Sequence, residues 1–345
     1  MRGAIFWVSL TLTPVTLVAH YGFGIEGTPS FVLSAGALAP LAFLIGEATE
    51  NVAEHTGARI GGFLNASFGN APELIIALFA VRSGLPNVVR GSLSGSVVST
   101  ALLVLGGAMV AGGDGRLDRR SLLLQIGMVL SAASLFLVPS IPGWHGDPER
   151  HALYVLTLPV AAVLLAGYLA LTSFNLRRHA ASPKAEPDDD AWSLKEGLVT
   201  LAVATVATAF VSEILVHSLD AFGHTLGLSQ FFVAAVIVAI VGNAAEQGGA
   251  VLIARRGNPG LGAEIAISSA SQVALFVTPA VALLSFLAGH DLPLAFRPIE
   301  LAAITGAALV VALTVANGRS SRRKGVMLLV AYATLVIAFG FVGER

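Results

Sequence analysis

Two similar segments of this chain indicate its fold: FGNAPELIIALFAVRSGLP at residues 68–86 and VGNAAEQGGAVLIARRGNP at residues 241–259. A shift of 173 residues aligns them without a gap, and it also places Ser96 on Ser269 and Ser99 on Gln272. Chance similarity between apolar segments does not keep Asn, Glu, Arg and Pro in one register, so the alignment predicts an internal duplication. The identical pairs are Gly69 and Gly242, Asn70 and Asn243, Ala71 and Ala244, Glu73 and Glu246, Ala77 and Ala250, Arg82 and Arg255, Gly84 and Gly257, and Pro86 and Pro259.

The composition around these segments is that of a membrane protein. Of the 345 residues 55% are apolar and only 12% are charged, whereas a soluble domain has about 25% charged residues. Each apolar run is long enough to cross about 30 Å of hydrocarbon as a helix, so we predict an all-α polytopic membrane protein with eleven transmembrane helices. The net charge of −1 does not favour binding to nucleic acid, and the absence of cysteine excludes disulfides and thiolate metal sites. The runs cover residues 4–21, 30–54, 60–81, 86–110, 121–141, 151–174, 196–219, 230–254, 259–288, 297–316 and 326–342.

The duplication and the runs together predict the organisation of the chain. Residues 1–22 form an N-terminal transmembrane helix, residues 30–174 a first five-helix repeat, and residues 195–345 a second. Residues 175–194 contain SPKAEPDDD, which resists packing and predicts a flexible linker. Because five is an odd number, the second repeat enters the membrane from the opposite side, and such inverted repeats are typical of secondary transporters.

The basic residues predict the orientation. With a cytoplasmic N-terminus and a cytoplasmic linker, fifteen of the twenty Lys and Arg residues lie on the cytoplasmic side, as the positive-inside rule requires. We therefore expect an integral protein of a prokaryotic cytoplasmic membrane, with the C-terminus on the opposite side. The five remaining basic residues are Arg82, Arg90, Arg150, Arg297 and Arg345.

Two acidic residues inside apolar runs predict the functional site. A carboxylate near the bilayer midplane costs about 2.5–3.5 kcal/mol, so Glu73 and Glu246 need a partner or a proton. Asn70 and Asn243 each lie three residues earlier, on the same helix face as the acid. Gly69 and Gly242 mark points where a helix is easily interrupted, which exposes backbone carbonyls toward a cavity. Ser96 with Ser99, and Ser269 with Gln272, repeat the three-residue spacing one helix later and supply further oxygens.

An oxygen-rich site with two carboxylates favours Ca2+, which binds six to eight oxygen ligands. Two acids held close together do not both ionise cheaply, so without metal they are expected to take up protons. Such a site holds either a divalent cation or protons, which is the minimum chemistry of an antiporter. Ca2+ is then the transported substrate, and no cofactor is predicted.

These motifs resemble a known family. GNAPELIIALFA and GNAAEQGGAV, with GSVVSTALLVLG at 95–106 and SSASQVALFVTP at 268–279, are similar to the paired signatures of the cation/proton exchanger (CAX) family of Ca2+/H+ antiporters. The resemblance implies that Glu73 and Glu246 are the essential metal-binding acids and that Asn70 and Asn243 are neighbouring ligands or hinges. LIGEATENVAEH at 44–55 and FVSEILVHSLD at 210–220 resemble the gating helices of the family. Through them, Glu50 and Glu213 correspond to acids that pass cations or protons to the centre; the alternative is that both simply face water near a helix end.

Two positions depart from the family pattern. Gln247 stands where family members commonly carry His, so a proton-sensing imidazole is not carried over. Pro72 replaces a β-branched residue before the first acid and is expected to stiffen or kink that half of the site. Glu264, early in the run 259–288, is interpreted as an interfacial residue.

Three other functions stay open on the sequence. Exchange of Na+ or K+ with H+ or Ca2+ needs the same scaffold. An intramembrane hydrolase has only Glu54 and His55 as a starting point, without the second His of H-E-x-x-H or a G-x-S-x-G motif, so we do not expect an enzyme. A passive channel usually lines a pore by oligomerisation, whereas this chain contains its own symmetric pair. One monomer is thus sufficient for one pathway, and a higher oligomer is not excluded.

Overall fold

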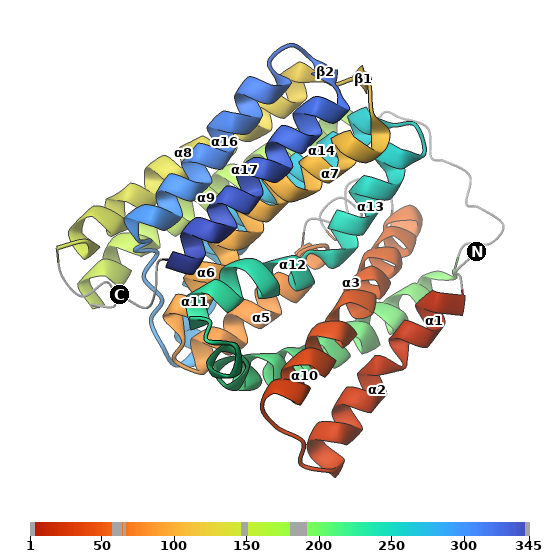
Figure 1. The fold of residues 1–345 in the computed structure, drawn as a ribbon, viewed down its shortest axis with the longest axis vertical. Helices are drawn as coiled ribbons and strands as arrows, with labels where there is room; N and C mark the ends of the chain where they lie inside the picture. Colours follow the sequence, from red (N-terminus) through yellow and green to blue (C-terminus); the bar gives the residue numbers. More distant parts are fainter. Residues whose placement is uncertain (1–3, 57–63, 65–66, 146–150, 180–191, 342–345) are drawn as a thin grey trace.

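The computed structural model describes residues 4–56, 64, 67–145, 151–179 and 192–341, and almost all of them are helical (Figure 1). Only helices and closed barrels satisfy every backbone polar group within a membrane, and the apolar runs of this chain form helices. The helices of the first half are α1 (Ala4–Leu10), α2 (Leu12–Leu17), η1 (Val18–Gly22), α3 (Thr28–Thr56), α5 (Ala71–Arg82), α6 (Pro86–Val98), η2 (Ser99–Val104), α7 (Leu105–Gly112), α8 (Arg119–Gly143) and α9 (His151–His179).

The second half begins after the predicted linker, most of which lies outside the described residues. Its helices are α10 (Leu194–Leu226), α11 (Gln230–Phe232), η3 (Val233–Val238), α12 (Ala239–Gly242), α13 (Ala244–Arg255), α14 (Pro259–Gln272), η4 (Val273–Val277), α15 (Thr278–Leu284), η5 (Ser285–Ala288), α16 (Pro298–Val315) and α17 (Arg322–Phe341). Two short strands, β1 (Gly115–Arg116) and β2 (Arg319–Ser320), pair antiparallel.

Within the described residues, eight helices are long and apolar enough to cross a membrane, and the bent pair Gln230–Gly242 and Ala244–Arg255 makes a ninth candidate. The predicted run 4–21 is divided among α1, α2 and η1. The predicted run 60–81 falls partly outside the described residues, and its described helix is α5. The prediction of a membrane protein built of helices is therefore confirmed.

Equivalent segments of the two halves have helix bounds that agree to within one residue. At a shift of 173 residues, Ala71–Arg82 of α5 becomes Ala244–Arg255, which is α13. In the same register Pro86 and Pro259 begin α6 and α14, and both of these helices continue into a π-helical segment, η2 and η4. The turns before them are closed by Gly84 and Gly257, whose positive φ angles of 67° and 97° favour glycine.

The helices pack through aromatic pairs and small residues. The rings of Phe31 in α3 and Phe222 in α10 stack with centroids 4.1 Å apart, while the other end of α3 meets the start of α10, where Val52 lies against Gly197. The two long helices therefore run antiparallel. Gly95 of α6 lies so close to the backbone of Ala235 in η3 that a Cβ atom would overlap it. Such contacts between small residues are typical of helices in membranes.

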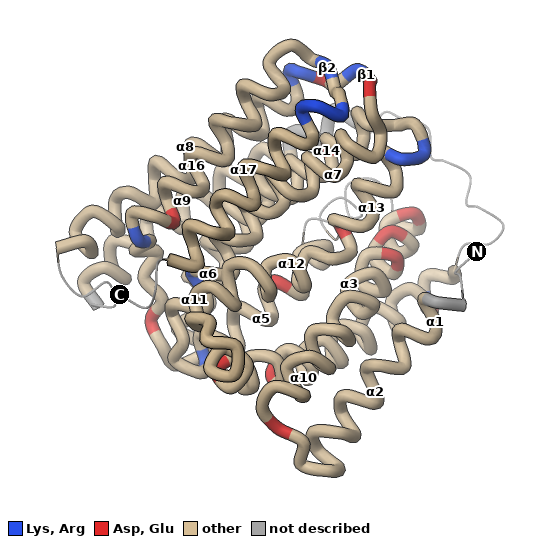
Figure 2. Tube along the Cα trace, in the orientation of Figure 1, with Lys and Arg blue, Asp and Glu red and all other residues tan. Residues whose placement is uncertain are grey.

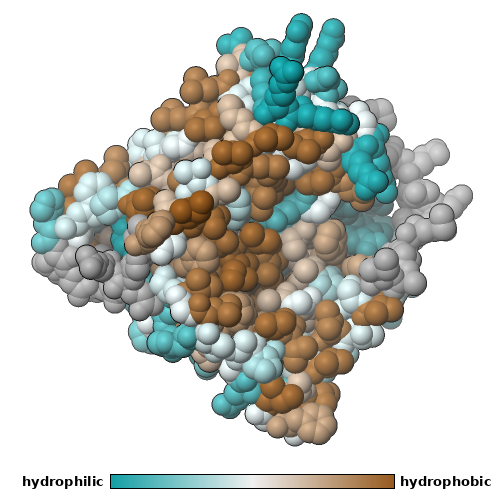
Figure 3. All heavy atoms as spheres, in the orientation of Figure 1, coloured by the Kyte–Doolittle hydropathy of each residue, from teal (hydrophilic) through white to brown (hydrophobic). Residues whose placement is uncertain are grey.

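The surface separates apolar from basic regions. Large apolar side chains such as Val163, Leu313 and Val330 are exposed. Figure 3 shows that hydrophobic residues, in brown, cover much of the face in view. At one end of the molecule the strand pair joins the α7–α8 and α16–α17 connections, and the start of α14 packs against β1 (Figure 2). We call this end the basic face; its residues are Arg116, Arg119, Arg120, Arg255, Arg256, Arg319, Arg322, Arg323 and Lys324.

Candidate cation-binding site

Two interrupted helices carry the predicted acids into the interior. A turn at Gly69 and Asn70 precedes α5, and α12 and α13 meet at Asn243 with a bend of 58°. Asn70 and Asn243 have similar backbone angles, with φ of −102° and −90°. Each acid is the third residue of its helix, so it lies at the N-terminal end, where the helix dipole is positive. The positive end of the dipole stabilises the ionised form of each acid, which is the form that binds a cation.

Pro72 fits this arrangement without a kink in α5. It is the second residue of the helix, where a missing N–H group leaves no intrahelical hydrogen bond unmade. Its fixed φ angle therefore helps to start the helix that carries Glu73. Pro72 therefore begins α5 rather than kinking it. That it stiffens this half of the site stays a prediction.

The two asparagines join one half of the chain to the other. The amide nitrogen of Asn70 donates to Oε1 of Gln272 at 2.7 Å. The amide nitrogen of Asn243 donates to Oγ of Ser96 at 2.8 Å and to the carbonyl oxygen of Ala239 at 2.7 Å. Both asparagines are only 1% exposed. Ser96, one helix after Glu73, thus contacts the asparagine of the second half, and Gln272, one helix after Glu246, contacts the asparagine of the first half.

The two carboxyl groups lie within electrostatic range of each other, and the hydrogen bonding of both is incomplete. The Glu73 side chain packs against Gly242, where a Cβ atom would lie 3.6 Å from Oε1 of Glu73, and the charge of Glu246 acts on Glu73. Oε2 of each acid is buried, and no described residue donates a hydrogen bond to it. A buried acceptor without a donor is costly, so each oxygen is suited to a cation or a proton.

The space around the two acids is unequal. Glu246 lines a cavity of about 280 Å³, whereas the cavity beside Glu73, Ser96 and Gly242 has a volume of about 10 Å³. A cavity needs at least about 10–15 Å³ to hold one water molecule, so the first cavity holds several waters and the second has room for one at most. The other residues that line the larger cavity are Gln125, Glu264, Ile265, Ser268, Ser269 and Gln272.

Comparisons with known proteins agree with this geometry. The model of the sodium/calcium exchanger protein family matches residues 27–177 and again residues 196–341. The chain belongs to this family. It is 32% identical to a Ca2+/H+ antiporter of Synechocystis, with 99% of this chain and 98% of the relative covered. It is 34% identical to the Ca2+/H+ antiporter ChaA of Bacillus subtilis, with 90% and 92% covered. The resemblance to the cation/proton exchangers is therefore confirmed.

Solved structures of exchangers share the fold. The structure of native YfkE has a TM-score of 0.84 and 30% sequence identity, and the match covers 98% of this chain and all of that chain. The H+/Ca2+ exchanger CAX has a TM-score of 0.74 at 14% identity, with 98% and 91% covered, and shows a common fold.

The remaining predicted residues of this exchanger-family chain lie in different surroundings. The hydroxyl of Ser99 is buried and donates to the carbonyl oxygen of Ser96 at 3.2 Å. Glu50 is exposed on α3 and Glu213 is half-buried on α10, and neither lines the two cavities described above. The amide nitrogen of Gln247 is buried without an acceptor among the described residues. Within the described part of the chain no three His, Asp or Glu residues come together as a metal site, so a metal here needs neutral oxygens beside the two acids.

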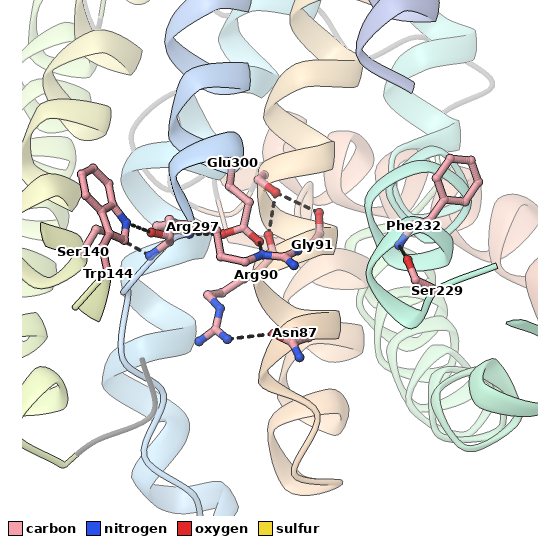
Figure 4. Close-up of polar contacts among 11 residues, drawn as sticks. Asn87, Arg90, Gly91, Ser140, Trp144, Ser229, Phe232, Arg297 and Glu300 are labelled. Atoms are coloured by element: carbon pink, nitrogen blue, oxygen red, sulfur yellow. Dashed lines mark hydrogen bonds and ion pairs between the residues drawn. The ribbon is translucent and has the colours of Figure 1, made fainter. Parts of the chain in front are cut away.

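Sequence reasoning missed a buried ionic cluster at the start of α16 (Figure 4). Glu300 is completely buried in the first turn of α16, and its carboxylate accepts from the backbone N–H of Arg297 at 2.6 Å and from Nε at 3.2 Å. Arg297 also lies 4.0 Å above the ring of Phe231. Arg90 on α6 is buried within electrostatic range of Glu300, and its Nη2 donates to Oδ1 of Asn87 at 2.9 Å. The signal in the sequence is the i, i+3 spacing of Arg297 and Glu300 around Pro298.

Proposed function

We propose that this chain exports Ca2+ in exchange for protons by alternating access. The observation that carries the proposal is the pair of acids, Glu73 and Glu246, each at the N-terminal end of an interrupted helix from a different half of the chain. The hydrogen bonds of Asn70 and Asn243 to the opposite halves hold the two helix ends together. The Ca2+/H+ antiporters to which the chain is at least 32% identical over nine-tenths of its length support the choice of substrates.

The proposed ligands are oxygens of both halves. Two carboxylates balance the charge of Ca2+, and amide, hydroxyl and backbone carbonyl oxygens complete a set of six to eight. Without the metal, protons neutralise the acids, because two buried negative charges close together are unfavourable. The site is thus occupied in alternation by Ca2+ or by protons. The proposed set consists of Glu73, Glu246, Asn70, Asn243, Gly69, Gly242, Ser96, Ser99, Ser269 and Gln272.

The proposed architecture is an N-terminal helix followed by two inverted five-helix repeats, eleven spans in all. The equal bounds of α5 and α13 and the two separate matches of the family model support the duplication. The antiparallel packing of α3 and α10 supports the inversion. We further propose that the basic face lies in the cytoplasm with the N-terminus, that the C-terminus lies opposite, and that one monomer contains one pathway.

We propose that the structure corresponds to a state open toward the cytoplasm. The larger cavity extends from Gln272 to Glu264 along α14, eight residues or about 12 Å at 1.5 Å per residue. Since α14 begins at the basic face, the cavity leads from Glu246 toward that face. On the other side, Gly91 packs against Phe231 and Gly95 against Ala235, which closes the path from Glu73. Glu50 and Glu213 are proposed to pass cations or protons when the helices rearrange.

Exchange of Na+ or K+ on the same scaffold is the second candidate. Solved structures of a sodium-calcium exchanger share the fold at a TM-score of 0.58 and 18% identity. Fold alone does not choose the cation, but the proposed ligand set of two acids and several neutral oxygens carries two negative charges, which balance one divalent ion.

The test is transport by purified protein in liposomes. Ca2+ uptake is measured with and without a pH gradient, and with Na+ or K+ gradients in place of the pH gradient. We expect uptake to require the pH gradient and to disappear in Glu73→Gln and Glu246→Gln. Uptake driven by Na+ or K+ but not by protons would replace the proposal with the second candidate.

A further inference from the structure

Glu264 lies at the outer end of the larger cavity in a polar cluster that the predicted site does not include. Oγ of Ser121 donates to Oε2 of Glu264 at 2.8 Å, and the amide nitrogen of Gln125 donates to the same oxygen at 2.9 Å. Gln125 also donates to Ser121 at 3.1 Å. The two α8 residues therefore fix the direction of a carboxylate that α14 supplies.

The cluster keeps acceptors for a ligand. The described residues give Oε1 of Glu264 no hydrogen bond, and Oε1 of Gln125 is buried without a donor. Both side chains line the cavity, together with Ser268 and, at its inner end, Glu246 and Gln272. The sequence-based interpretation of Glu264 as a plain interfacial residue is therefore incomplete, because its carboxylate lines the path to the central acids.

The cavity has room for a hydrated cation. Ca2+ with about seven waters needs about 70–105 Å³ at about 10–15 Å³ for each water, and the cavity has about 280 Å³. A cation in the cavity is therefore able to keep most of its water. It exchanges water for protein oxygens only at the end of the cavity that Glu246 and Gln272 line.

The first half of the chain has no equivalent of this cluster. In the 173-residue register, Glu264 corresponds to Gly91 and Ser268 corresponds to Gly95. A Cβ atom on Gly91 would lie 3.0 Å from the ring of Phe231, and one on Gly95 would overlap the backbone of Ala235. The outer carboxylate therefore belongs to the half that opens toward the basic face and is absent from the half that is closed.

We propose that Glu264, held by Ser121 and Gln125, is an outer binding site for a hydrated divalent cation that enters from the basic face. The cation binds there through water and through Oε1 of Glu264 before it moves inward and loses its water at Glu73 and Glu246. This inference rests on the proposed function for the identity of the cation. It adds a second, weaker site that serves one face of the protein.

The test compares Glu264→Gln, Glu264→Asp and the parent in vesicles that expose the basic face and in vesicles that expose the opposite face. Initial exchange rates are measured against Ca2+ concentration at low ionic strength and again in an inert salt. Glu26→Gln, which removes an exposed acid from the connection before α3, is the control.

We expect Glu264→Gln to raise the half-saturating Ca2+ concentration at the basic face about tenfold. This is the effect of one charge about 6 Å from a divalent ion in water, about 1.4 kcal/mol. The change is expected to fall on half-saturation rather than on the maximum rate, to shrink in salt, to be absent at the opposite face, and to be largely restored by Glu264→Asp.

An unchanged half-saturating concentration at low ionic strength would overturn the proposal, as would an equal change at both faces. A lower maximum rate with unchanged half-saturation would assign Glu264 a packing role and also overturn it. If the parent fails to exchange Ca2+ for protons, the proposed function fails separately. The same comparison is then made with the monovalent cation that the parent transports, for which the expected rise is about threefold.

Discussion

The buried cluster of Glu300, Arg297 and Arg90 predicts a large loss of stability in Glu300→Gln. Glu300 is the carboxylate in direct contact with Arg297, and it neutralises charge at the point where α6 of the first half meets α16 of the second. The glutamine side chain keeps the size of the acid and is still able to accept from the Arg297 backbone. The substitution thus removes the charge and leaves most of the packing.

The magnitude follows from the burial of the pair. Removal of one partner of a buried ion pair costs about 3–5 kcal/mol, because the other charge is left uncompensated. With an unfolding entropy of about 2.1 cal/mol/K per residue, a chain of 345 residues loses about 0.7 kcal/mol of stability per degree at the midpoint. The expected decrease in Tm is therefore about 4–7 °C.

The assay is thermal unfolding of the purified protein in detergent, with Glu26→Gln as the exposed control. The control is expected to unfold within about 1 °C of the parent, because an exposed acid contributes little. The double variant Arg297→Gln with Glu300→Gln is expected to recover part of the loss, since it removes both buried charges of the pair. A Tm of Glu300→Gln equal to that of the parent would refute the argument that the pair stabilises the junction.

Three further predictions concern packing, protons and orientation. Gly95→Ala is expected to reduce the yield of monodisperse protein strongly because its Cβ overlaps the Ala235 backbone, whereas Gly127→Ala, with nothing within 4 Å, is expected to leave the yield unchanged in gel filtration. The half-saturating Ca2+ concentration is expected to rise as the pH falls, because protons compete with Ca2+ for Glu73 and Glu246. Uptake measured between pH 6 and 9 tests this, and Gln247→His is expected to add a titration step to the pH profile. A half-saturating concentration that does not change with pH would exclude direct competition. Reporter fusions are expected to place the N-terminus in the cytoplasm and the C-terminus outside, and a cytoplasmic C-terminus would contradict the inverted repeats.

The interrupted helices were predictable because their cause is local. The sequence predicts a helix break before each acid, and the structure has a turn at both places. The residues that indicate the breaks are Gly69, Asn70 and Pro72 in the first half and Gly242 and Asn243 in the second. The register of 173 residues also predicts that α5 and α13 have the same bounds. These features depend on backbone freedom and on residue spacing, which the sequence contains.

The partners across the two halves were not predictable in the same way. A helical period gives the face on which Asn70 lies, but not that Gln272 of the other half accepts its hydrogen bond. For Glu264 the hydropathy pattern indicates a shallow depth, but not that Ser121 and Gln125 turn its carboxylate into a cavity. The buried position of Glu300 was not predictable for a related reason, since the neutralisation of its charge depends partly on Arg90 from a helix of the first half.

The central claim is that Ca2+ and protons occupy the same two carboxyl groups, and a count of protons released on Ca2+ binding tests it most directly. Calorimetric titration of the purified protein with Ca2+, in buffers of different ionisation enthalpy, gives this count for the parent, Glu73→Gln and Glu246→Gln. The account predicts that Ca2+ binding to the parent releases protons and that each variant loses both the binding and the release. Ca2+ binding that releases no protons at any pH, or a variant that keeps the binding and the release of the parent, would contradict it.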